Sequence, residues 1–219
     1  MSLLVKICGL STRETLDAAL GAGADMVGFV FFPASPRHLP LAPARELASA
    51  VRGRAKKVAL TVDADDLSLA DVMAAVKPDM LQLHGRESTA RVEEIRQRFA
   101  VEVMKAVAVS TAADLGAIEG YKSVCDRILF DARPPTGASR PGGLGAAFDW
   151  QVLKNLDIGL PFMVSGGLSA HNVEEALRVT GAGGVDVSSG VERAPGVKDP
   201  DMIERFIRAA RAFNEVTAR

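Results

Sequence analysis

The amino-acid sequence predicts an α/β protein, a single (β/α)8 TIM barrel domain spanning residues 1–219. Short runs rich in β-branched residues alternate with amphipathic stretches along the chain, and eight such alternations can be counted. Alternation of this kind builds a parallel sheet with helical crossovers, and eight units close into a barrel. No linker, low-complexity tract or change in composition divides the chain. A doubly wound open sheet is the alternative, because periodicity does not show closure.

Strands are expected where apolar runs are bounded by glycine, proline or polar turn residues. Eight segments meet this description: residues 3–8, 25–31, 57–62, 80–84, 101–107, 127–131, 161–165 and 184–188. The first helix is expected over residues 12–20, with Ser11 as its N-cap, Glu14 three positions later, and Gly21 and Gly23 closing it. Apolar stripes at helical spacing recur later, at Val92, Ile95 and Phe99 and at Ile203, Phe206, Ile207 and Ala210.

Composition and charge exclude several classes of partner. The 26 basic and 27 acidic side chains give a net charge of −1, whereas nucleic acids and anionic membranes attract a basic surface. No apolar run approaches the roughly twenty residues that cross a bilayer, and the start MSLLVKICGL has no signal-peptide pattern. Cys8 and Cys125 are too few for a disulfide framework or a zinc site. We therefore expect a cytoplasmic protein with no metal, no nucleic acid and no membrane partner.

The chemistry of a parallel barrel lies at the carboxyl ends of its strands, so the residues that close each strand are candidates for a site. The first strand ends at Cys8, and alternation puts Lys6 on the same face one layer below. A nearby cation lowers the pKa of a thiol, so Cys8 is a candidate base or nucleophile. The alternative is a small buried apolar residue, which is what we expect for Cys125.

Two further strand ends have polar side chains. The fourth strand ends at His84, with Gln82 on the same face, and the sixth ends at Asp131 after an apolar run. A buried aspartate with few partners has a raised pKa and can act as a general acid. A structural histidine and a turn-capping aspartate are the alternatives at these two positions.

Glycine-rich loops follow the last three strands. The connection at residues 132–148 is long for a barrel loop, which is typical of ligand-binding loops and lids. Glycine clusters lie at residues 142–145, 165–167 and 188–190. Glycine lets the backbone approach a ligand, and barrel enzymes bind phosphate on the loops after strands seven and eight. For any one cluster taken alone, an ordinary turn is the alternative. Together, and in this order along the chain, the three clusters favour a phosphate site.

A proline-stiffened loop follows the second strand. Pro33 and Pro36 restrict its backbone and would hold Arg37 in place, where the planar guanidinium can meet a carboxylate or a phosphate. A solvated surface arginine is the alternative, and spacing alone does not decide between them.

Segments at these strand ends match one family in order along nearly the whole chain: KICGL (6–10), GFVFFPASPRHL (28–39), LQLHG (81–85), LFDARPPTGASRPGGLGAAFDW (129–150), VSGGL (164–168) and GVDVSSGVERAPGVKD (184–199). With them the sequence resembles the phosphoribosylanthranilate isomerase family, barrel enzymes of tryptophan biosynthesis. The resemblance implies an Amadori rearrangement of an N-(5-phosphoribosyl)anthranilate aminoaldose to the aminoketose, without a cofactor. The partner would be a small phosphorylated sugar substrate, and the protein would be a monomer or a homodimer.

The resemblance also assigns roles to the candidate residues. Asp131 would protonate the furanose ring oxygen as the general acid. Cys8 would take the proton from the second sugar carbon as the general base. Arg37, in the family's SPR motif, would hold the anthranilate carboxylate. The phosphate would rest on backbone amides around Gly143, Gly167, Ser189 and Gly190, and Gly166 would be a further substrate-binding residue. His84 would belong to the pocket without a defined role.

Two positions depart from the family pattern. Leu144 stands where the loop commonly has threonine, which puts a side-chain contact to phosphate in doubt, and Asp63 adds a charge where asparagine is common. Other barrel enzymes match less well: the histidine-pathway isomerase would have aspartate in place of Cys8, and indole-glycerol-phosphate synthase would have a catalytic lysine and glutamate after an amino-terminal extension. A barrel that only binds a phosphorylated ligand is the alternative from another class, and a scaffold would leave the glycine clusters unexplained.

Overall fold

The strands form a closed parallel barrel in the structure, a computed structural model that describes residues 3–133, 137–138, 140–143, 145 and 148–217. In chain order the strands are β1 (Leu4–Cys8), β2 (Met26–Phe31), β3 (Lys56–Thr61), β4 (Met80–Leu83), β5 (Glu102–Val109), β6 (Arg127–Ala132), β7 (Phe162–Val164) and β8 (Gly184–Val187). The barrel closes where β8 pairs with β1, with Leu4 opposite Gly184 and Ile7 opposite Val187. This closure confirms the predicted barrel and excludes the open sheet. No predicted strand bound differs from the observed one by more than two residues.

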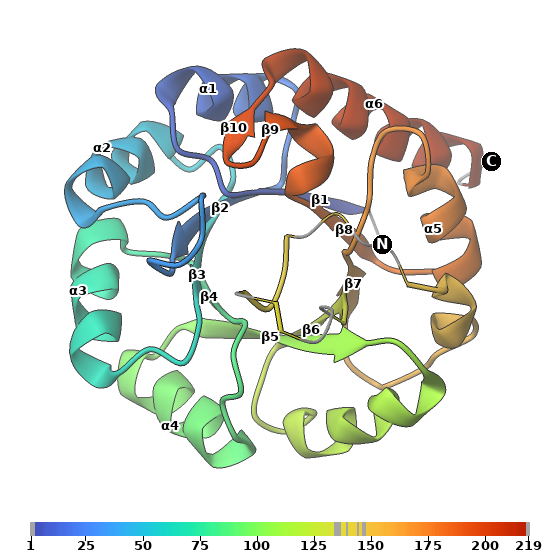
Figure 1. The fold of residues 1–219 in the computed structure, drawn as a ribbon, viewed down its shortest axis with the longest axis horizontal. Helices are drawn as coiled ribbons and strands as arrows, with labels where there is room; N and C mark the ends of the chain where they lie inside the picture. Colours follow the sequence, from blue (N-terminus) through green and yellow to red (C-terminus); the bar gives the residue numbers. More distant parts are fainter. Residues whose placement is uncertain (1–2, 134–136, 139, 144, 146–147, 218–219) are drawn as a thin grey trace.

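Helices surround the barrel as an outer ring (Figure 1). The α-helices are α1 (Arg13–Gly21), α2 (Leu41–Val51), α3 (Asp66–Val76), α4 (Thr89–Phe99), α5 (Val173–Thr180) and α6 (Pro200–Thr217). The connections after β5 and β6 contain 3₁₀ helices instead, η1 (Ala112–Tyr121) and η2 (Trp150–Leu153). Gly116 and Gly120 lie within η1, and glycine disfavours a regular α-helix. Over the described part of the chain, none of the helices has both the length and the apolar character needed to cross a membrane.

The first helix begins one residue later than the sequence predicts. Its N-cap is Thr12 and not Ser11, because the Thr12 backbone is extended and its hydroxyl accepts a hydrogen bond from the Thr15 N–H at 3.2 Å. Serine and threonine both cap helices well. The choice between them therefore depends on where the loop leaving β1 meets the helix axis, which the local sequence does not encode.

Side chains of the barrel strands pack in separate layers on the two faces of the sheet. On the outer face, Ile7 and Phe29 belong to one large cluster that includes the inner sides of the helices. The interior near the strand starts is filled by Met26, Val58, Met80, Met104, Ala106, Leu129 and Met163. Methionine is unbranched and fits irregular interior space. Nearer the carboxyl ends, Cys8, Val30 and Leu60 form an inner cluster of their own, directly beneath the loops.

A small hairpin follows the last barrel strand. After the short 3₁₀ helix η3 (Ser189–Val191), strands β9 (Glu192–Ala194) and β10 (Val197–Lys198) pair in antiparallel fashion. In the view of Figure 1 the hairpin appears between α1 and α6. Lys198 of the hairpin bonds to Ser188, directly after β8, and Ser188 bonds to the Cys8 carbonyl at the end of β1, so the hairpin lies at the seam where the first and last barrel strands meet.

Candidate active site

A pocket lies at the carboxyl ends of the strands, where the barrel fold predicts it. The predicted site residues that line it are Cys8, Arg37, His84, Asp131, Gly143, Gly166, Gly167 and Ser189. Gly190 is absent from the described lining, and a Cβ at this position would overlap the Leu168 carbonyl oxygen. Close packing of the loops after β7 and β8 therefore requires glycine there, and its contact with phosphate stays a prediction.

Cys8 lies at the top of the barrel interior, with Lys6 fully buried one layer below it. Alternation along β1 thus puts both on one face, as predicted. Lys6 Nζ donates a hydrogen bond to Asp186 Oδ1 on β8 at 2.9 Å. Gly28 on β2 lies opposite Cys8, and a Cβ there would be 3.0 Å from the Cys8 sulfur, so glycine makes room for the thiol.

The pKa of Cys8 is raised, whereas the sequence predicted that Lys6 would lower it. Burial is the largest cause, because it disfavours the thiolate, and the Asp186 carboxylate acts in the same direction. The ammonium groups of Lys6 and Lys198 lower the pKa without overcoming burial. Lys6 itself stays charged: burial alone would lower its pKa, but Asp186 and Cys8 raise it. The thiol form of Cys8 therefore dominates at neutral pH.

Asp131 has three hydrogen-bonding contacts, so the expectation of few partners was wrong. Its Oδ1 accepts hydrogen bonds from Ser165 Oγ at 2.8 Å and from the Ala132 N–H at 2.9 Å. Its Oδ2 lies 3.1 Å from His84 Nε2, and His84 Nδ1 lies 3.0 Å from Gln82 Nε2. With the Gln82 amide donating to Nδ1, the imidazole has its hydrogen on Nε2 and donates to Asp131. His84 thus joins the pocket as a partner of the carboxylate.

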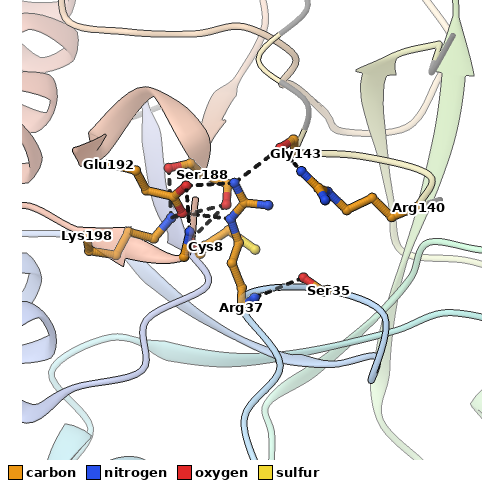
Figure 2. A network of polar contacts seen from close by, with 9 residues as sticks. Cys8, Ser35, Arg37, Arg140, Gly143, Ser188, Glu192 and Lys198 are labelled. Carbon is orange, nitrogen blue, oxygen red and sulfur yellow. Dashed lines mark hydrogen bonds and ion pairs between the residues drawn. The ribbon is translucent and has the colours of Figure 1, made fainter. Parts of the chain in front are cut away.

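Arg37 is a buried residue of the pocket, 4% exposed, which excludes a solvated surface arginine. Its backbone N–H donates to Ser35 Oγ at 3.2 Å within the proline-stiffened loop. Its Nε and Nη2 donate to the two carboxylate oxygens of Glu192, each at 2.7 Å, and Nη2 also donates to the Gly143 carbonyl at 3.1 Å (Figure 2). A bidentate pair of this kind fixes the plane of the guanidinium group.

Two charged residues of the hairpin, Glu192 and Lys198, belong to the site although the sequence patterns did not single them out. Lys198 Nζ donates to Glu192 Oε1 at 2.7 Å, to the Ser188 carbonyl at 2.7 Å and to Ser188 Oγ at 3.1 Å. Burial lowers the pKa of Lys198 to about 8, although Glu192 acts to raise it. Burial acts to raise the pKa of Glu192, but Arg37 and Lys198 hold it below its ordinary value. Their only sequence signal is their place in the segment 184–199.

The remaining positions of interest lie around the pocket rim. Arg140 lines the pocket, and its Nη2 donates to the Gly143 carbonyl at 3.4 Å beside Arg37 (Figure 2). The Asp63 carboxylate accepts a hydrogen bond from the Arg86 N–H at 2.6 Å, so its added charge has a backbone partner. Leu144 and part of the loop 132–148 lie outside the described residues. Within the described residues, no group of three or more His, Cys, Asp or Glu side chains could hold a metal ion.

A family model and a sequence relative match the chain over most of its length. The model described as N-(5'-phosphoribosyl)anthranilate (PRA) isomerase matches residues 5–209. A protein of Bradyrhizobium sp. (strain ORS 278) named N-(5'-phosphoribosyl)anthranilate isomerase is 68% identical over 219 residues, covering 100% of both chains.

Solved structures of the same kind of protein superimpose on the barrel. The crystal structure of phosphoribosyl anthranilate isomerase from Thermotoga maritima has a TM-score of 0.86 and 34% identity, covering 96% of this chain and 99% of that one. A phosphoribosyl anthranilate isomerase in complex with reduced 1-(o-carboxyphenylamino)-1-deoxyribulose 5-phosphate has a TM-score of 0.82 and 32% identity, with the same coverage. Because both the family model and a relative of full length match, the chain belongs to the N-(5'-phosphoribosyl)anthranilate isomerase family.

Proposed function

We propose that the protein is an N-(5'-phosphoribosyl)anthranilate isomerase, which converts its aminoaldose substrate to 1-(2-carboxyphenylamino)-1-deoxyribulose 5-phosphate in tryptophan biosynthesis, without a cofactor. One observation supports this best: a thiol, a carboxylate and a buried arginine converge in one pocket, as Cys8 from β1, Asp131 from β6 and Arg37 from the loop after β2. Family membership and the similarity to a structure that binds a reduced form of this product add support.

In this proposal Asp131, in its protonated form, is the general acid that opens the sugar ring. Oδ1 accepts two hydrogen bonds, from Ser165 and the Ala132 N–H, whereas Oδ2 accepts one from His84 among the described residues. Oδ2 therefore keeps a position for the proton that it delivers. A Cβ at Gly142 would lie 2.5 Å from Oδ2, so glycine keeps the approach to this oxygen open. The proton goes to the furanose ring oxygen, the bond from that oxygen to the first carbon breaks, and the anilino nitrogen forms a Schiff base with that carbon.

Cys8 is then the general base that removes the proton from the second sugar carbon. The electron pair of that C–H bond moves toward the iminium nitrogen and gives an enolamine. Because the pKa of the Cys8 thiol is raised, its thiolate is a small fraction at neutral pH, but the thiolate is a strong base once it forms. The ammonium groups of Lys6 and Lys198 stabilise its negative charge. The enolamine gains a proton at the first carbon and loses its hydroxyl proton, so the overall change is an isomerisation.

The two anionic ends of the substrate would anchor it across the pocket. Arg37 would bind the ring carboxylate through Nη1, because Nε and Nη2 already bond to Glu192 and Gly143. The phosphate would bind on the glycine loops, where Gly166 and Gly167 adopt positive φ values of 84° and 64°. Such anchoring holds the reacting carbons between acid and base, which is a large part of the rate enhancement in enzymes of this kind. The residues proposed for the phosphate are Gly143, Gly166, Gly167, Ser189 and Gly190.

The test follows anthranilate-type fluorescence as freshly generated phosphoribosylanthranilate is converted by the wild-type protein, by Cys8→Ser and by Asp131→Asn. We expect turnover by the wild type and a loss of about 10²–10⁴-fold in each variant, which is the usual contribution of general acid–base catalysis. Far-UV circular dichroism checks that the variants fold. An inert wild-type protein would contradict the proposed reaction, and a variant with near wild-type turnover would remove that residue from its role.

We also propose that the protein works in the cytoplasm, as a monomer or homodimer, without metal, nucleic acid or membrane partner. A thiol base must stay reduced, and the cytoplasm keeps thiols in that form. Light scattering coupled to gel filtration distinguishes a particle of 23.1 kDa from its dimer.

A further inference from the structure

The guanidinium group of Arg37 is bound by a carboxylate from the other end of the chain. Arg37 lies in the loop after β2 and Glu192 begins β9, and their side chains are only 4% and 3% exposed. The two bonds of 2.7 Å from Nε and Nη2 to the Glu192 oxygens occupy one edge of the guanidinium plane. Nη2 also bonds to the Gly143 carbonyl, whereas Nη1 has no hydrogen bond to the described residues. The Nη1 edge is therefore the one available to a ligand.

Glu192 is itself held on its other side. Lys198 Nζ donates to Oε1 at 2.7 Å, and the Gly196 N–H donates to Oε2 at 3.2 Å. Lys198 also bonds to Ser188, whose hydroxyl donates to the Cys8 carbonyl at 3.2 Å (Figure 2). A continuous network therefore runs from the arginine to the backbone of the strand that bears the base.

The hairpin also packs directly on the arginine loop. A Cβ at Gly196 would lie 2.5 Å from the Pro36 carbonyl oxygen, so the turn of the hairpin is in close contact with the residue before Arg37. Both the backbone and the guanidinium of Arg37 are thus held by the same hairpin. Such double support is what keeps a long, flexible side chain in one orientation.

The charges of the network leave one positive charge for a ligand. Arg37 and Lys198 are cations and Glu192 is the single anion between them. A bidentate carboxylate neutralises much of the attraction that a free arginine has for any anion. The arrangement instead fixes a direction, because among the hydrogen bonds of the described residues Nε and Nη2 are used and the Nη1 edge is left to donate to a ligand carboxylate.

We propose that Glu192 is a positioning residue for substrate recognition, which orients Arg37 so that its Nη1 edge meets the aromatic carboxylate, and that Lys198 holds Glu192 in place. This inference rests on the proposed function, in which Arg37 binds that carboxylate. Glu192 acts through Arg37 and has no contact of its own with the substrate carboxylate in this scheme. Its replacement should therefore affect ligands only when they have the carboxylate.

The experiment compares two stable ligands that differ only in that group. The first is reduced 1-(o-carboxyphenylamino)-1-deoxyribulose 5-phosphate, and the second is the same compound without the ring carboxylate. Dissociation constants are measured by calorimetry for the wild type, Arg37→Ala and Glu192→Gln. We expect Glu192→Gln to weaken binding of the first ligand about 10- to 100-fold, which corresponds to one charged hydrogen bond, and to leave the second within about threefold.

A control variant removes an ion pair far from the pocket, one that is about one third exposed. Asp25 accepts hydrogen bonds from Arg211 Nη2 at 2.6 Å and from the Val5 N–H at 2.7 Å, at the opposite ends of the strands. Asp25→Asn should bind both ligands as the wild type does. If Glu192→Gln does not fold, Glu192→Asp gives the same comparison, because it keeps the charge but withdraws it from Arg37 by one methylene.

The outcomes separate this inference from the proposed function. If Arg37→Ala loses affinity for the carboxylated ligand alone while Glu192→Gln keeps or gains affinity for it, the positioning role of Glu192 is wrong and the role of Arg37 stands. Equal losses for both ligands in Glu192→Gln would show a merely structural hairpin and also overturn the inference. If Arg37→Ala does not distinguish the two ligands, the assignment of the carboxylate to Arg37 falls, and the inference falls with it. In turnover, the supporting result is a raised KM with a smaller change in kcat.

Discussion

Lys6 is a charged residue that lies fully inside the barrel. It is fully buried, and the Asp186 carboxylate that neutralises it at 2.9 Å is itself only 6% exposed. An ion in a low-dielectric interior is tolerated only with a well-placed partner, and the loss of one partner leaves the other charge uncompensated. The pair thus places a cation beneath Cys8. Each of its two charges is tolerated in the interior only while the other is present.

Lys6→Met should lower the free energy of unfolding by about 3–5 kcal/mol, because Asp186 is left buried without its cation. Urea denaturation at neutral pH measures this loss. The double variant Lys6→Met with Asp186→Asn should recover part of the stability, since it removes both charges. A double variant no more stable than the single one would show that the ion pair is not the cause.

The Cys8 thiol should ionise only well above neutral pH. Burial raises its pKa above the ordinary value of 9.0, so the thiolate should be a small fraction at pH 7 and should still be increasing at pH 9. The measurement is the ultraviolet absorbance of the thiolate from about pH 6 to about pH 10 in Cys125→Ala, which removes the other buried thiol, with Cys8→Ser added as the control. A Cys8 thiolate that is already fully formed below pH 7 would contradict the raised pKa.

Residues at strand ends were predictable, and those whose position depends on distant chain segments were not. Cys8 and Asp131 close apolar runs, so local alternation alone predicts that they face the pocket. Glu192 meets Arg37 across 155 positions of sequence. The strands of its hairpin are so short that no periodicity marks them. The partners of Asp131 escaped prediction for the same reason, because Ser165 and His84 reach it from other strands.

Among the elements, the strands were the easiest to predict and the helix ends the hardest. A buried strand is marked by its own apolar run, whereas η1 depends on glycines that interrupt a helix and on packing against its neighbours. The N-cap of α1 shows the same limit. Ser11 and Thr12 are both suitable residues, and only the three-dimensional path of the chain selects the second.

Thr12→Ala should destabilise the protein by about 1 kcal/mol, because the Thr15 N–H loses its acceptor at the start of α1. Ser11→Ala should have a much smaller effect, since Ser11 does not cap the helix. Thermal or urea unfolding of the two variants side by side makes the comparison. A larger loss of stability in Ser11→Ala than in Thr12→Ala would show that Ser11 is the N-cap, as the sequence pattern predicts.

For the whole molecule, closure of the barrel makes each end depend on the other. β1 pairs with β8, so neither half of the strand set completes the barrel alone. We therefore predict that residues 1–219 unfold as one domain. Far-UV circular dichroism reports on all elements, whereas the fluorescence of Trp150, the single tryptophan, reports on the region after β6. The two signals should give one coincident urea transition, and separate midpoints would show more than one folding unit.

The long separation between Arg37 and Glu192 also has a consequence during synthesis of the chain. During translation the arginine leaves the ribosome 155 residues ahead of the carboxylate that orients it. β1 is likewise made before its pairing partner β8, because synthesis runs from the amino terminus to the carboxy terminus. A nascent chain that stalls before the hairpin therefore holds the thiol, the acid and the arginine without the contact that orients the arginine. If Glu192 orients Arg37 as proposed, the carboxylate-binding geometry is complete only once the hairpin has been made.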